Sequence, residues 1–122
     1  ALAAGWENYR LSEFDRAIRF FEDALRLAPA DSDAHLQALY GLGTTWNLRR
    51  PGEDRKKAEA CFQQIMAAAP TGDVGAWTAL ALARMKHLVP VGEEPDVAAV
   101  RQAYTEVMRR YPGHLAAKEA FI

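Results

Sequence analysis

EFDRAIRFFEDALRLAP, residues 13–29, is the stretch that decides the fold of this chain. Its apolar residues recur every three or four positions and charged residues fill the positions between them, which is the pattern of an amphipathic helix with one buried face. Ser12 can cap the helix at its N-terminus, and Pro29 prevents the helix from continuing. The stretch therefore predicts a surface helix over residues 14–28.

The same spacing continues along the rest of the chain and predicts seven helices and no strand. Short segments rich in Pro, Gly and Asp separate the helices. The chain has 122 residues, half of them hydrophobic and a quarter charged, which suits one soluble domain with a core. The expected helices span residues 1–10, 14–28, 32–48, 54–69, 73–88, 96–111 and 114–122.

Every second helix of this series carries the same residue pattern. Pro29, Pro70 and Pro112 lie 41 and 42 residues apart, and each is preceded at fixed offsets by a small or branched residue, an aromatic residue and a medium-sized residue. These triplets are Ala17, Phe21 and Ala24, then Ala58, Phe62 and Ile65, then Val100, Tyr104 and Val107. A pattern that recurs at a fixed period predicts a helical repeat with one standard packing surface.

The helix before each of these carries a small residue, which lets two helix backbones approach closely, and large residues that anchor the pair. Gly5 has this role in the first pair, Gly43 in the second and Ala81 in the third. The large residues around them are Tyr9, then Leu39, Leu42 and Trp46, then Trp77 and Leu80.

Together these positions resemble the tetratricopeptide repeat family. Its signature is Trp-x-x-Leu-Gly-x-x-Tyr on the first helix, followed by Ala, an aromatic, Ala and Pro on the second. The family period is about 34 residues, shorter than the 41 and 42 found here. Because the extra residues fall at loops or helix ends, the tetratricopeptide interpretation is preferred to HEAT or armadillo repeats. In the first repeat the match also includes Phe14.

The resemblance implies an all-α, right-handed α-solenoid of antiparallel helix pairs, with six helices and a C-terminal capping or truncated helix. We expect a single domain over residues 1–122, with repeats at residues 1–31, 32–72 and 73–113 and a terminal helix at 114–122. The chain begins with Ala1 rather than methionine, and we expect it to be a fragment of a longer protein.

In this family the first helices line a concave groove that holds a peptide or helix of a partner. By helical position, the lining is expected to comprise Trp6, Tyr9, Arg10, Tyr40, Thr44, Asn47, Leu82 and Met85. An equally weighted alternative is that the aromatic residues of this set pack against one another or against a preceding helix. The lysine, asparagine and arginine clamp of some family members is not expected, because Leu2 and Trp6 occupy its first two positions.

Other chemistry finds little support in the sequence. Asp31, Asp33 and His35 could suggest a metal, but a helix cap formed by Asp31 or Ser32 explains the same residues, and no nucleophile, base or cofactor motif is present. The basic cluster of residues 49–57 is best explained as a solvated turn, and a net charge of −1 argues against nucleic-acid binding. No apolar run is long enough for a membrane span.

We therefore predict a non-catalytic protein–protein interaction scaffold with no cofactor and no metal. The alternative is a structural segment of a longer solenoid that self-associates through its terminal helices. Residues 106–122 also resemble repeat boundaries in bacterial envelope-assembly proteins of this superfamily. The compartment stays open between the cytoplasm and a bacterial periplasm.

Overall fold

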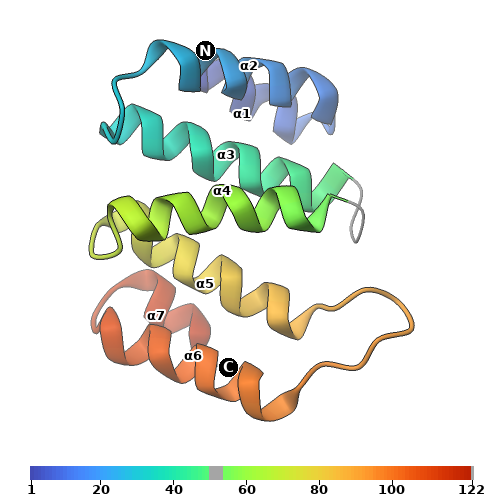
Figure 1. Ribbon diagram of the computed structural model, residues 1–122, viewed down its shortest axis with the longest axis vertical. Helices are drawn as coiled ribbons and strands as arrows, with labels where there is room; N and C mark the ends of the chain where they lie inside the picture. The colour runs from blue at the N-terminus through green and yellow to red at the C-terminus, as the bar shows by residue number, and fades with distance from the viewer. Residues whose placement is uncertain (50–53, 122) are drawn as a thin grey trace. The chain divides into compact units, whose positions relative to one another are not determined.

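A computed structural model of the chain (Figure 1) describes residues 1–49 and 54–121. Within these residues the protein is all-helical, with seven helices and no strand, as predicted. The ends of the helices lie within two residues of the expected ends. The helices are α1 (Leu2–Arg10), α2 (Phe14–Leu27), α3 (Asp33–Arg49), α4 (Arg55–Ala68), α5 (Asp73–His87), α6 (Val97–Arg110) and α7 (Leu115–Ala120).

The chain divides into two compact units, Ala1–Ala68 with helices α1 to α4 and Ala69–Ile122 with helices α5 to α7. Ile122 and most of the turn predicted around residues 50–53 lie outside the described residues. None of the helices described is both long enough and apolar enough to cross a bilayer.

In the N-terminal unit each helix packs against the next one along the chain, and α1 also contacts α3. The amphipathic face of α2 forms the centre of the unit, because Ala17, Ile18 and Phe21 are buried together with Leu42 of α3 and Cys61 of α4. The triplet singled out in the sequence, Ala17, Phe21 and Ala24, is buried in α2. The core of this unit is therefore built on the stretch that repeats in the sequence.

Glycines let the aromatic rings of this unit sit directly against helix backbones. A Cβ atom added at Gly5 of α1 or at Gly41 of α3 would lie within 2.7 Å of the Phe21 ring, and one added at Gly43 would lie 2.5 Å from Phe62 Cε1. Two residues along a helix turn it by about 200°, so Gly41 and Gly43 face opposite sides of α3. Gly5 and Gly43 were predicted to let helix backbones approach each other, and in the structure they, like Gly41, make room for an aromatic ring of the neighbouring helix.

The turn between α1 and α2 differs from the prediction. Ser12 was expected to cap α2, but Glu13 occupies the N-cap position and no side chain there accepts a hydrogen bond. Ser12 instead adopts a left-handed conformation with φ of 60°, and its backbone N–H donates to the carbonyl of Tyr9 at 3.0 Å. The prediction was wrong because α1 ends in a tight backbone turn that uses Ser12 for its closure.

In the C-terminal unit α5, α6 and α7 all contact one another. Its core contains Ala76 and Leu80 of α5, Val107 of α6 and Ala116 of α7, with Tyr111 buried at the end of α6. The N-terminal unit shows the same relation among its first three helices, since α1 contacts α2 and α3, and α2 contacts α3. Each unit therefore contains three consecutive helices that all contact one another.

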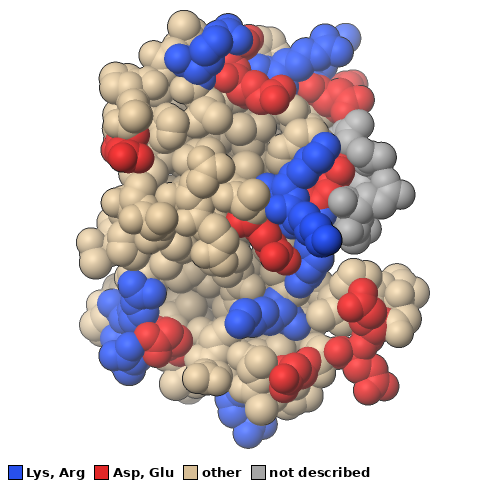
Figure 2. Space-filling view, in the orientation of Figure 1, with Lys and Arg blue, Asp and Glu red and all other residues tan. Residues whose placement is uncertain are grey.

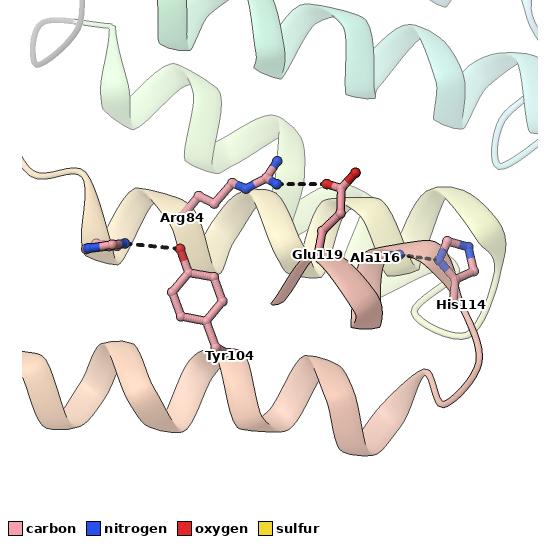
Figure 3. Close-up of polar contacts among 6 residues, drawn as sticks. Arg84, Tyr104, His114, Ala116 and Glu119 are labelled. Carbon is pink, nitrogen blue, oxygen red and sulfur yellow. Dashed lines mark hydrogen bonds and ion pairs between the residues drawn. The ribbon is translucent and has the colours of Figure 1, made fainter. Parts of the chain in front are cut away.

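His114 holds the start of α7 in place (Figure 3). Its Nδ1 atom accepts a hydrogen bond from the backbone N–H of Ala116 at 2.9 Å, so this nitrogen carries no proton. The Nε2 atom therefore carries the ring proton and donates it to Asp73 Oδ1 at 2.6 Å. At the other end of α7, Arg84 of α5 donates to Glu119 at 2.8 Å.

Candidate functional site

An aromatic surface, defined here as Trp6, Tyr9 and Tyr40, lies on α1 and α3 of the N-terminal unit. The ring centroids of Trp6 and Tyr9 are 5.4 Å apart with the rings nearly perpendicular, and those of Trp6 and Tyr40 are 6.4 Å apart. All three side chains are partly exposed. The aromatic surface therefore joins α1 to α3.

The core below fixes the position of these rings. Trp6 meets the buried ring of Phe21 edge-on with centroids 4.9 Å apart, and Tyr40 lies 6.1 Å from Phe62. Trp6 and Tyr9 share one side of α1 because residues three apart on a helix are neighbours. Edge-to-face aromatic pairs of this kind contribute about 0.5–1.5 kcal/mol each beyond their buried area. The rings therefore form a preorganised surface rather than a set of independent side chains.

The surroundings of the aromatic surface are polar and close to neutral. Thr44 and Asn47 are partly buried on α3, and Arg10 is exposed and paired with Glu7 at 2.8 Å. Burial raises the pKa of the Tyr9 hydroxyl, so this group stays protonated well above neutral pH. On the face that Figure 2 shows, Lys and Arg lie beside Asp and Glu over α2. Arg26 and Asp23 of α2 form an ion pair at 2.9 Å. The surface suits an apolar ligand with few charges.

The eight residues predicted to line a groove divide between the two units. Six lie in the N-terminal unit and are exposed or partly exposed, namely Trp6, Tyr9, Arg10, Tyr40, Thr44 and Asn47. Leu82 and Met85 belong to α5 of the C-terminal unit. Leu82 is partly exposed, whereas Met85 has only 4 % of its surface exposed. Met85 therefore departs from the expected accessible lining, because helical position alone does not show which residues a neighbouring element covers.

The structure also bears on the alternative in which the aromatic residues pack against one another. Trp6 contacts Tyr9, Phe21 and Tyr40, so mutual packing is present. Each ring nevertheless keeps part of its surface accessible. The same residues therefore stabilise the unit and present an aromatic face.

Ser32 and Asp33, in the segment considered for a metal, form hydrogen bonds at the start of α3. The Ser32 hydroxyl accepts a hydrogen bond from the backbone N–H of His35 at 3.2 Å, which confirms a cap at the start of α3. Asp33 accepts a hydrogen bond from Gln37 at 2.6 Å. In the described parts of the chain, no three His, Cys, Asp or Glu residues gather in a way that could hold a metal ion.

Cys61 is buried in the core of the N-terminal unit. Burial, with a smaller contribution from the negative charge of Glu22, raises the pKa of its thiol to about 11. A protonated, buried thiol is a poor nucleophile because the thiolate is the reactive form. Cys61 therefore acts as a packing residue in this core.

Some contacts near these residues were not expected from the sequence. The Lys57 ammonium of α4 lies 4.3 Å from the centroid of the Trp46 ring, a cation–π contact that links α3 to α4. The sequence pattern singled out Gly43 but not Gly41, because the tetratricopeptide signature contains one glycine, whereas both glycines face an aromatic ring.

Comparison with protein-family models, curated proteins and solved structures gives no match for this chain.

Proposed function

We propose that the chain is a non-catalytic protein-binding module of the tetratricopeptide type, whose aromatic surface holds an apolar segment of another protein. The repeat arrangement, a right-handed solenoid of antiparallel pairs, is part of this proposal. It is supported by the contacts of α1 with α2 and α3, and by the Phe21 and Phe62 rings seated on glycines at the expected positions.

One observation carries the functional part of the proposal. Trp6, Tyr9 and Tyr40 are in contact, partly exposed and fixed from below by Phe21 and Phe62. Aromatic side chains are enriched where proteins bind one another, and rigid ones lose little conformational entropy on binding. A surface of this kind binds apolar anchors of a peptide or amphipathic helix.

The residues around the aromatic surface define the class of ligand more closely. Arg10 is already paired with Glu7, and Thr44 and Asn47, which are predicted to line the groove on α3, are uncharged. A strongly charged segment would lose hydration here without gaining ion pairs. The expected ligand is therefore a segment with two or more apolar anchors and hydrogen-bonding groups between them.

A selection from a random displayed peptide library tests this function. The chain should enrich peptides with spaced apolar residues, and the Trp6→Ala/Tyr40→Ala double variant should bind them at least about tenfold more weakly, since aromatic anchors often contribute 2 kcal/mol or more. Phe20→Ala is the matched control because Phe20 is an exposed aromatic residue of α2 outside the aromatic surface. Thermal unfolding by circular dichroism monitors the fold of each variant.

Equal affinity of the double variant and the unchanged protein for the selected peptides would contradict the proposal. Loss of binding in Phe20→Ala alone would place the binding surface on α2 instead. A selection that yields no peptide above background would also count against a peptide-binding role for this surface.

A further inference from the structure

A groove of about 330 Å³ lies on the C-terminal unit, at the end of α7. Six residues of α6 line it at helical spacing over three turns, from Val97 to Met108, and His87 of α5 closes one side. Ala120 and Phe121 form the end at which α7 stops. The groove therefore follows the surface on which α7 itself lies.

This surface already holds a helix for part of its length. α7 packs on both α5 and α6 through the small buried residues Ala116, Ala117 and Ala120. It has 6 residues, whereas α5 beside it has 15. The nine residues of difference correspond to about 13 Å of helix. A helix placed in line with α7 would continue an interface that the protein already forms.

The walls of the groove are apolar and accessible. Val97 is 64 % exposed and Phe121 is 78 % exposed, while Tyr104 and Met108 are partly buried against the core of the unit. The Tyr104 hydroxyl lies 3.3 Å from His87 Nδ1, and their rings meet edge-on, so the edge of the groove is fixed (Figure 3). Accessible apolar side chains gathered in one groove are typical of a surface that binds another protein.

Arg101 supplies the charge that such a helix would have to match. Its side chain lines the groove and forms no ion pair with another described residue. The neighbouring part of the same surface shows how a helix is held there, because Glu119 of α7 pairs with Arg84 of α5 at 2.8 Å. An acidic residue on an incoming helix would repeat this contact at Arg101.

A second copy of the chain fits this requirement poorly. The amphipathic faces of α2 and α4 are buried within the N-terminal unit, and α5 places Ala76, Leu80 and Ala83 in the core of the C-terminal unit. We propose that the groove binds an amphipathic helix of a different polypeptide, with an apolar row on Tyr104 and Met108 and an acidic residue at Arg101. This inference is independent of the aromatic surface, which belongs to the other unit.

The test uses the full chain and a synthetic lactam-stapled peptide of about 15 residues. The peptide is alanine-based, with leucines at alternating three- and four-residue spacing and glutamates flanking the leucine row. Nuclear magnetic resonance of the protein should show shifts confined to residues 97–108, His87 and Phe121. Arg101→Glu should weaken binding about tenfold, and a peptide with lysine in place of glutamate should restore it to within about threefold.

Two further variants separate the groove from its surroundings. Val97→Asp should weaken binding about tenfold, and because Val97 is exposed the fold should persist, which unchanged shifts of core residues would verify. Lys86→Glu is the matched control, a charge reversal next to His87 that does not line the groove, and its affinity should change by less than about twofold.

Three outcomes would overturn the proposal. One is peptide-induced shifts outside the groove, or no binding at about millimolar peptide. Another is that Arg101→Glu binds the glutamate and lysine peptides equally well. The third is a dimer in sedimentation equilibrium that Val97→Asp dissociates, which would assign the groove to a second copy of this chain.

Discussion

The hydroxyl of Tyr111 donates a hydrogen bond to the backbone carbonyl of Pro70, which lies 41 residues earlier in the chain. The contact joins the end of α6 to the segment that leads into α5. His114 and Asp73 form a second contact across 41 residues. Both contacts span the same number of residues that separates Pro29 from Pro70 in the sequence.

Tyr111→Phe should therefore destabilise the C-terminal unit by about 1–2 kcal/mol, because it leaves the Pro70 carbonyl without its partner while keeping the ring in the core. Urea unfolding followed by circular dichroism measures the change. Tyr104→Phe serves as the comparison, since the Tyr104 hydroxyl bonds to an exposed histidine, and it should cost clearly less. An unchanged unfolding midpoint in Tyr111→Phe would argue against the Pro70 contact in solution.

Gly41→Ala and Gly43→Ala should each lower the free energy of unfolding by about 1–2 kcal/mol. The added methyl groups meet the Phe21 and Phe62 rings, and this overpacking outweighs the gain of about 1 kcal/mol in helix propensity. Gly72→Ala, whose Cβ would lie 3.9 Å from the nearest atom, should be nearly neutral. The decisive measurement is a double-mutant cycle: Phe21→Leu should relieve part of the cost of Gly41→Ala but none of the cost of Gly43→Ala.

The thiol of Cys61 should make stability depend on pH in the alkaline range. Its pKa is raised from 9.0 to about 11 in the folded protein, so below pH 9 the thiol is protonated in both the folded and the unfolded states. Between pH 9 and about 11 only the unfolded chain releases the proton, and the free energy of unfolding falls by up to about 3 kcal/mol.

Comparison with Cys61→Ala isolates this effect, because other groups titrate equally in both proteins. Below pH 9 the difference in free energy of unfolding between the two proteins should stay constant. Above pH 9 the free energy of unfolding of the unchanged protein should fall relative to that of Cys61→Ala. At neutral pH, labelling of Cys61 by a thiol reagent should require unfolding of the N-terminal unit. Rapid labelling of the folded protein would show that the thiol is accessible.

His114→Ala should destabilise α7 by about 0.5–2 kcal/mol, since it removes the acceptor for the Ala116 N–H. His114→Asn should recover most of this loss because asparagine is a favourable N-cap residue. Hydrogen exchange of the α7 amides, read by nuclear magnetic resonance, reports the change locally. Equal exchange rates in the alanine and asparagine variants would mean that the cap contributes little.

Local sequence patterns predicted the helices well because each one carries its own signals. The three-and-four spacing in residues 14–28 and the proline at 29 define α2 without reference to any other part of the chain. The triplet of Ala17, Phe21 and Ala24 likewise marks a buried face that the structure confirms. Periodicity reports which side of a helix is apolar, and in α2 the centre of that side is buried.

The candidate site was less predictable because it depends on contacts between helices. Helical position brought Trp6, Tyr9 and Tyr40 into one set, but it could not show that Trp6 rests on Phe21. It also could not show that Met85 is covered, since a residue on a given face is exposed only if no other element lies over it. The groove beside α7 was missed for the same reason.

Gly41 and Gly43 allow two aromatic rings to pack closely on α3, with Phe21 on one side of the helix and Phe62 on the other. Deleting Leu42 between them would rotate one glycine by about 100° relative to the other and direct a side chain at one ring. The register of α3 is therefore constrained from both sides, because an insertion or deletion between the two glycines would disturb the packing of Phe21 of α2 or of Phe62 of α4.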